Sequence, residues 1–163
     1  MTEESVYLSL GSNLGKRERN LRRAVQGLSV ILGQVRCSSI YETRPMYVEQ
    51  QPKFLNMVVA GYFYGQPTDL LQRILELELK LGRDRENFTP KGPRIIDIDI
   101  LLFGGRIVNQ KDLLIPHPYL KERQFVLIPL LELEPDLRDP ESGRPLAESL
   151  RSLEDQGVYI FSS

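Results

Sequence analysis

The chain of 163 residues has little of what marks secreted, membrane-spanning or nucleic-acid-binding proteins. It has one cysteine, Cys37, so no disulfide can form within it, and a reducing compartment fits this composition. We expect Cys37 to be a small core residue on a strand. The formal net charge is −1, and no apolar run approaches the roughly 20 residues that span a bilayer. The acidic N-terminus lacks the basic and apolar regions of a secretory signal. We therefore expect a cytoplasmic protein without a nucleic-acid or membrane partner.

Two familiar phosphate-binding motifs are also absent. No Gly-x-x-x-x-Gly-Lys-Ser/Thr sequence occurs, which excludes a P-loop. No Gly-x-Gly-x-x-Gly follows the first expected strand, which excludes the fingerprint of dinucleotide-binding folds. Gly11-Ser12 followed by an Asp-x-Asp is similar to the polymerase-β-like nucleotidyltransferases, but those two elements lie much closer in sequence there than they do here.

Patterns of apolar residues predict an α/β (α+β) fold. The expected strands are 6–10, 35–41, 54–64, 95–103 and 158–161, and the expected helices are 16–32, 68–81, 121–134 and 145–153. Thr68 is the expected N-cap of the second helix, and Gly82 is expected to end it. Gly104-Gly105 predicts a hairpin turn with a return strand at 106–108. The order β-α-β-β-α-β within 6–103 predicts a ferredoxin-like sandwich, a mostly antiparallel sheet with helices packed on it.

The apolar run 95–103 carries two carboxylates, Asp97 and Asp99. Side chains alternate along a strand, so both acids share one face with Leu101, while Ile98 and Leu102 are expected on the opposite face, in the core. At a rise of roughly 3.3 Å per residue, the two Cβ atoms lie about 6 to 7 Å apart. Carboxylates at that spacing can converge on two divalent cations. Two negative charges this close together between isoleucines also repel each other, unless a cation or several hydrogen-bond donors offset them. The pattern favours a metal site over an exposed face with two solvated acids.

Basic residues cluster around this strand in the sequence: Arg83, Arg85, Lys91, Arg94 and Arg123. Any one of them alone is typical of a solvated surface charge. Several beside an acidic pair favour a polyphosphate substrate, because guanidinium groups bind phosphate through paired hydrogen bonds. Phosphoryl transfer needs metal ions, cations and in-line positioning, and Mg²⁺ suits it because it binds through one or two carboxylates plus substrate oxygens. His117, the only histidine, lies between two prolines, and its spacing leaves a structural and a functional role open.

Five motifs in register resemble those of one enzyme family, 6-hydroxymethyl-7,8-dihydropterin pyrophosphokinase of folate biosynthesis. They run from the opening strand to about residue 137. They are Gly11-Ser12-Asn13-Leu14-Gly15, Phe54-Leu55-Asn56, Gly82-Arg83-Asp84-Arg85, Gly92-Pro93-Arg94-x-x-Asp97-x-Asp99, and Pro116-His117-Pro118 followed by Arg123-x-Phe125-Val126-Leu127. The resemblance implies an ATP-dependent transferase in which residues 1–163 form a single pyrophosphokinase domain. We expect this domain to be a monomer.

The resemblance also implies the residues of the nucleotide and metal sites. Asp97 and Asp99 would bind two Mg²⁺ ions, and with Arg83 and Arg94 they form the expected catalytic set. The ATP-binding residues implied are Glu78, Arg83, Arg85, Arg94, His117 and Arg123, with the main chain near Ile100 at the adenine.

The implied pterin site has aromatic walls. Phe54 and Phe125 would stack on the two faces of the flat heterocycle, although without the resemblance core packing would be the expected role of both. Asn56 can donate and accept hydrogen bonds at the amide and amino edge of the pterin. Main-chain groups near Thr43 and Met46 would complete that edge.

Three positions depart from the common family pattern. Pro90-Lys91 stands where many members carry Arg-Trp, in a loop one residue longer, and Lys91 could supply the cation missing there. Leu75 stands where a glutamine is common, and Arg44 where some members have proline.

Two alternatives of other kinds stay open. One is a different Mg²⁺-dependent nucleotidyltransferase, which would release pyrophosphate instead of AMP. The other is a non-catalytic ferredoxin-like binding module, such as an RNA-binding domain. That module needs exposed aromatics on its central strands and a basic face. The strand 95–103 presents two acids instead, which would repel phosphodiesters.

Overall fold

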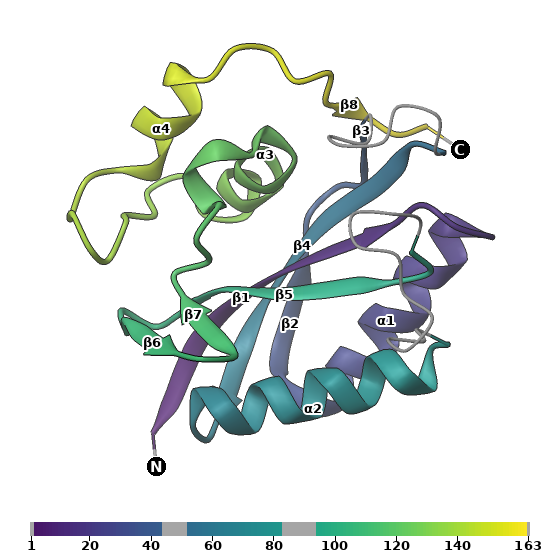
Figure 1. The fold of residues 1–163 in the computed structure, drawn as a ribbon, viewed down its shortest axis with the longest axis horizontal. Helices are drawn as coiled ribbons and strands as arrows, with labels where there is room; N and C mark the ends of the chain where they lie inside the picture. The colour runs from purple at the N-terminus through teal and green to yellow at the C-terminus, as the bar shows by residue number, and fades with distance from the viewer. Residues whose placement is uncertain (1, 44–51, 83–93, 163) are drawn as a thin grey trace.

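The sheet at the centre of the molecule joins strands from the whole length of the chain (Figure 1). The computed structural model describes residues 2–43, 52–82 and 94–162, and within them the main sheet has six strands. Its order is β5 (Asp97–Phe103), β1 (Glu3–Ser12), β4 (Phe54–Tyr64), β3 (Tyr41–Thr43) and β8 (Tyr159–Ile160), while β2 (Gly33–Cys37) also pairs with β4. Every pairing is antiparallel. The expected ferredoxin-like sandwich is confirmed.

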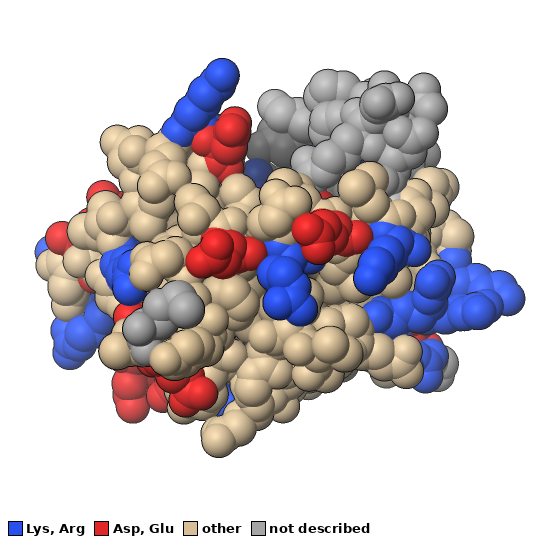
Figure 2. All heavy atoms as spheres, turned by 90° about the horizontal axis from the view of Figure 1, so that it is seen from below, with Lys and Arg blue, Asp and Glu red and all other residues tan. Residues whose placement is uncertain are grey.

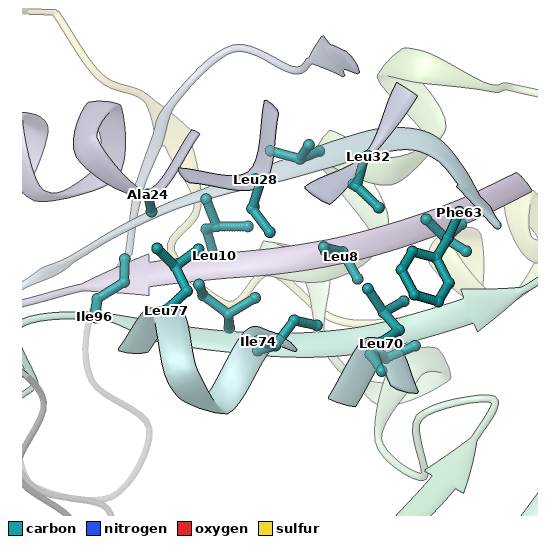
Figure 3. Packing of buried hydrophobic residues seen from close by; sticks show 14 of the residues in the cluster. Leu8, Leu10, Ala24, Leu28, Leu32, Phe63, Leu70, Ile74, Leu77 and Ile96 are labelled. Atoms are coloured by element: carbon teal, nitrogen blue, oxygen red, sulfur yellow. The ribbon is translucent and has the colours of Figure 1, made fainter. Parts of the chain in front are cut away.

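Two helices cover one face of this sheet. Helix α1 (Arg17–Ile31) buries Leu21, Ala24 and Leu28, and α2 (Pro67–Lys80) buries Leu70 and Ile74 at helical spacing. Figure 3 shows Ala24 and Leu28 of α1 and Leu70 and Ile74 of α2 on the side of the sheet where Leu8 and Leu10 of β1 point. Both helices and the strands β1, β4 and β5 therefore share one core, whose strand members include Val6, Leu8, Leu10, Leu55, Met57, Val59, Ile98 and Ile100.

The opposite face carries a second, smaller core. Helix α3 (Gln124–Leu133) packs over β4 and β3, and it is followed by α4 (Leu146–Ser152) and preceded by the 3₁₀ turn η1 (Leu120–Glu122). This core contains Tyr7, Val58, Ala60, Val126, Leu127 and Leu130. Asp97 and Asp99 alternate onto this same face of β5, which is the edge strand of the sheet.

A bulge in β5 overturns one expected side-chain direction. Tyr7 lies opposite Leu102 while Leu8 lies opposite Ile100, so Leu101 is an extra residue on β5. Leu101 and Leu102 consequently both enter the second core, and Phe103 returns to the first. The prediction that Leu102 lies with Ile98 is wrong, because strict alternation holds only where the pairing has no bulge.

Three local predictions also differ from the structure. The N-cap of α2 is Gln66 and not Thr68, because Pro67 occupies the first helical position, where its missing N–H costs nothing. Cys37 lies on β2 but is exposed and not in the core. The expected strand 35–41 is divided between β2 and β3. Gly82 does follow the end of α2, with φ +98.

The expected return strand after β5 does not form. The turn is present, with Gly104 at φ +53 and the Arg106 N–H bonded to the Phe103 carbonyl at 3.0 Å. The next strand, β6 (Val108–Gln110), pairs instead with β7 (Leu113–Ile115). The outer edge of β5 has other partners: the Glu78 carboxylate accepts from the Ile98 N–H, and the His117 N–H donates to the Leu101 carbonyl.

The outer surface of α2 carries charges of both signs. Asp69, Arg73, Glu76 and Lys80 are exposed there at spacings of three and four residues. Figure 2, seen from the side of this helix, shows acidic and basic side chains alternating on it without a large patch of one sign. Among the described residues, no helix is both long enough and apolar enough to cross a bilayer.

Candidate active site

The two acids of β5 lie on one face of the sheet, each beside a different basic side chain. Arg94 Nη1 is 3.4 Å from Asp97 Oδ2, and His117 Nε2 is 4.0 Å from Asp99 Oδ2. The side chains of Asp97 and Asp99 are 28% and 42% exposed, so both carboxylates reach solvent while the flanking isoleucines hold the strand in the core. A half-buried pair of oxygen donors that reaches solvent from a strand is suited to a hard divalent cation.

Arg94 is held in place by a buried asparagine. The Arg94 N–H donates to Asn13 Oδ1 at 2.6 Å, and the Asn13 N–H donates to the Arg94 carbonyl at 2.9 Å. Asn13 Nδ2 also donates to the Pro52 carbonyl at 3.3 Å. Its role was not predicted, because within Gly-Ser-Asn-Leu-Gly an asparagine fits an ordinary turn. One side chain thus ties the end of β1 to two segments that are distant in sequence.

His117 is an uncharged ring with a defined tautomer. Burial, aided by the positive charge of Arg123, lowers its pKa to about 4, against an opposite effect of Asp97. The Tyr119 N–H donates to His117 Nδ1 at 3.1 Å, so at neutral pH the proton is on Nε2, the nitrogen nearer Asp99. This histidine can therefore donate a hydrogen bond into the site at neutral pH, but it adds no positive charge.

Arg123 lies between aromatic rings at the start of α3. Its guanidinium carbon is 4.7 Å from the centroid of the Tyr119 ring and 5.5 Å from that of Phe125. Such contacts orient a guanidinium while leaving its N–H groups able to bind an anion. Phe125 is half-buried and packs against the second core. Its expected binding role and its packing role are therefore compatible.

Glu78 is fully buried on α2, where its carboxylate accepts from the Ile98 N–H at 2.9 Å. The N–H and C=O groups of Ile98 therefore point away from β1. Because these groups alternate in direction from one residue to the next along a strand, those of Ile100 point to the same outer edge. The Glu78 side chain thus joins α2 to the outer edge of β5, the edge to which the main chain of Ile100 also points.

A pocket of about 550 Å³ lies along this edge. Its lining comes from α2, β5, the β6–β7 hairpin and the segment after β7: Leu71, Leu75, Ile98, Asp99, Ile100, Lys111, Asp112, Leu113, Leu114, His117 and Pro118. The volume is within the usual range of about 300–1,000 Å³ for small-molecule sites. The hairpin residues were not among the predicted site residues, because only the pairing of β6 with β7 brings them to the edge of β5.

The remaining predicted residues lie on the same face of the sheet, toward β3. Thr43 pairs with Phe54, and Gly11 pairs with Asn56 on one side and with Asp97 on the other. Since paired residues share a face, the expected pterin-binding side chains and the acidic pair face the same side. Asn56 is buried, and the Thr43 hydroxyl donates to its Oδ1 at 3.4 Å.

Gly11 on β1 places no side chain at the centre of this face. A Cβ at Gly11 would be 3.6 Å from Phe54 Cδ1 and 3.8 Å from Asn56 Nδ2. Glycine here leaves a gap of one side chain between Asn56 and Asp97, directly beside an aromatic ring. Arg83, Arg85 and Met46, with Arg44 and Lys91, lie outside the described residues.

Comparison with known proteins agrees with the resemblance seen in the sequence. The family model of 7,8-dihydro-6-hydroxymethylpterin-pyrophosphokinase matches residues 7–135. The chain is 45% identical over 132 residues to a 2-amino-4-hydroxy-6-hydroxymethyldihydropteridine pyrophosphokinase of Bacillus subtilis, covering 78% of this chain and 77% of that protein. It is 40% identical over 144 residues to the protein of the same name from Aquifex aeolicus, covering 88% and 89% of the two chains.

Other relatives are much longer than this chain. It is 39% identical over 156 residues to the folic acid synthesis protein fol1 of Pneumocystis carinii, which covers 95% of this chain but only 21% of that protein. A crystal structure of wild-type HPPK-DHPS from Plasmodium falciparum with pteroate superposes with a TM-score of 0.73 at 16% identity, covering 92% of this chain and 42% of that one. The latter likeness supports the fold alone. On the family match and the identities to the bacterial proteins, the chain belongs to the 7,8-dihydro-6-hydroxymethylpterin-pyrophosphokinase family.

Proposed function

We propose that this chain transfers the pyrophosphoryl group of ATP to 6-hydroxymethyl-7,8-dihydropterin, releasing AMP. The observation that carries the proposal is the single sheet face described above. On it, the half-buried acidic pair beside Arg94 lies on one side of Gly11, and Asn56 and the aromatic ring of Phe54 lie on the other. A polyphosphate and a flat, polar-edged heterocycle can thus be bound side by side in a chain of this family.

The proposed pterin site uses the β3–β4 end of this face. The gap at Gly11 gives the ring room to lie over the sheet, with Phe54 and Phe125 as its aromatic walls. Asn56 binds the amide edge, oriented by its contact with the Thr43 hydroxyl. The main chain near Met46 is the further expected contact.

The proposed nucleotide site uses the outer edge of β5. The pocket beside Ile100 receives the base, and the main chain at this edge offers hydrogen-bonding groups to it. Arg94 and Arg123 bind phosphate oxygens, and His117 donates from Nε2. Arg83 and Arg85 are proposed to bind the same phosphates.

The donors present fit Mg²⁺. Asp97 and Asp99 supply two oxygen ligands, and among the described residues no group of three or more His, Cys, Asp or Glu side chains that could hold a metal ion gathers here or elsewhere. A site of two carboxylates leaves coordination positions for water and phosphate oxygens, which Mg²⁺ prefers. We propose that Asp97 and Asp99 hold two such ions. When bound, the ions neutralise charge on the phosphates and lower the pKa of the attacking hydroxyl.

The reaction requires in-line positioning of the two substrates. The hydroxymethyl oxygen of the pterin forms a bond to the β-phosphorus and loses its proton to water. The bond from that phosphorus to the α,β-bridging oxygen breaks, and AMP departs with the electron pair. Arg94 and Arg123 offset the charge that shifts to the leaving phosphate.

The direct test is a chromatographic assay of purified protein with ATP, Mg²⁺ and the pterin. We expect pterin-dependent AMP that EDTA abolishes. Asp99→Asn should abolish it too, whereas Asp136→Asn, at an exposed position, serves as the matched control. Release of pyrophosphate instead of AMP would indicate a nucleotidyltransferase, and no pterin dependence would refute the acceptor. We also propose that the chain is active as a monomer.

A further inference from the structure

The C-terminal segment, residues 156–161, contacts two separate parts of the molecule. At one end it binds the start of α3, and at the other it adds β8 to the sheet beside β3. It lies outside the residues that match the family model, 7–135. Tyr159 and Ile160 are 43% and 63% exposed, and Phe161 is half-buried against the first core. The contacts of Gln156 and Tyr159 are polar and specific, which favours a positioning role for these two residues.

Gln156 forms a reciprocal pair with Gln124, the first residue of α3. The Gln124 N–H donates to Gln156 Oε1 at 2.9 Å, and the Gln156 N–H donates to Gln124 Oε1 at 2.8 Å. Gln156 Nε2 also donates to the Glu122 carbonyl at 2.9 Å. Two of these bonds fix the main chain at Glu122 and Gln124, on both sides of Arg123 and immediately before Phe125.

Tyr159 anchors the other end of the segment. Its hydroxyl donates to Glu42 Oε1 at 2.9 Å and accepts from Lys53 Nζ at 2.8 Å. Arg17 Nη1 completes the cluster, because it donates to Glu42 Oε2 and to the Lys53 carbonyl, both at 2.7 Å. Glu42 immediately precedes Thr43, and Lys53 immediately precedes Phe54.

The main chain of the segment reinforces this anchor. Glu42 pairs with Tyr159 and Tyr41 with Ile160, and the Phe161 N–H donates to the Ile40 carbonyl at 2.9 Å. Helix α3 is also tied to β3 by the Tyr41 hydroxyl, which donates to Glu132 at 2.5 Å. That tie is at the far end of α3, about two helical turns from Phe125, so it does not fix the end where the aromatic wall lies.

We propose that residues 156–161 set the distance between the two aromatic walls of the pterin site, with Gln156 positioning Phe125 and Tyr159 positioning Phe54. The inference rests on the proposed function. Neither residue touches substrate; each acts through the main chain next to a wall. Loosening either end should weaken pterin binding and leave the nucleotide pocket at the edge of β5 unaffected.

The first test uses the ligand-free protein and does not depend on the substrate. Amide hydrogen exchange should rise about three- to tenfold in peptides containing Gln124 and Phe125 for Gln156→Ala, and in those containing Glu42 or Phe54 for Tyr159→Phe. Ile160→Thr, on the same strand with an exposed side chain, is the control and should leave both regions unchanged. Unchanged exchange in Gln156→Ala and Tyr159→Phe would overturn the proposal.

The second test measures affinity by titration calorimetry. We expect the pterin Kd, measured with a nonhydrolysable ATP analogue present, to rise about three- to tenfold in each variant. The Kd of the analogue should change less than twofold in Tyr159→Phe. In Gln156→Ala it should rise less than the pterin Kd, because Arg123 lies between the two residues that Gln156 binds. Equal losses for both ligands would mean a general structural role and refute the assignment. Failure of the wild-type chain to bind the pterin would refute the proposed function, and the exchange result would still decide whether the segment holds the two walls.

Discussion

Asn13 and Arg94 bind each other through main chain and side chain together, across 81 positions of sequence. The same asparagine side chain reaches the Pro52 carbonyl. Because Asn13 is fully buried, its amide cannot exchange these partners for water without local opening. The arginine beside the acidic pair is therefore held from the end of β1.

Replacing this asparagine should damage activity and stability together. Asn13→Ala removes an acceptor from Arg94 and a donor from Pro52, and it leaves a small cavity. We expect a loss of about 1–3 kcal/mol in the free energy of unfolding, measured with urea, and a lower kcat. Asn109→Ala, at an exposed position of β6, is the control and should change neither. Wild-type turnover in Asn13→Ala would show that the position of Arg94 does not matter.

Neutralising one acid of β5 should separate metal binding from folding. Asp99→Asn should reduce turnover by a factor corresponding to about 3 kcal/mol or more. Without metal its thermal midpoint should equal or exceed that of the wild type, because one of two like charges is gone. Mg²⁺ with an ATP analogue should raise the wild-type midpoint and raise that of the variant much less. A variant with wild-type turnover would refute the metal role.

Phe125 has two contacts to lose. Its ring is the proposed second wall of the pterin site, and its centroid lies 5.5 Å from the Arg123 guanidinium carbon. We expect Phe125→Ala to weaken pterin binding by about 1–3 kcal/mol and ATP binding by less than 1 kcal/mol. Phe125→Leu keeps the packing against the second core and loses the aromatic face, so it should retain stability while losing pterin affinity. Calorimetric titration of each ligand measures both; full pterin affinity in the leucine variant would exclude stacking.

A feature could be predicted from the sequence where it depends only on residues that are close together in the chain. The bounds of β4 and the shared face of Asp97 and Asp99 follow from alternation, which the strand fixes by itself. The bulge at Leu101 does not, because it depends on the register against β1. The roles of Asn13 and Gln156 depend on partners far away in the sequence, which only the folded chain brings together.

A pH test is provided by Asp139, a buried carboxylate in the loop between α3 and α4. Burial raises the pKa of this carboxyl, but the Glu141 N–H, the Lys121 ammonium and the Ser142 hydroxyl outweigh burial and lower it below its ordinary value. A carboxyl whose pKa is lower in the folded state stabilises the protein above its unfolded pKa, roughly 4, and this contribution disappears as the pH falls through the folded value.

Asp139→Asn should therefore cost about 1–3 kcal/mol of unfolding free energy at pH 7, and the difference from the wild type should shrink below about pH 4. Urea unfolding of both proteins across this range measures it. Asp136→Asn nearby provides the control, since that side chain is exposed. A difference independent of pH would mean that the loop is held by its shape and its neutral hydrogen bonds, and that the charge on Asp139 contributes nothing.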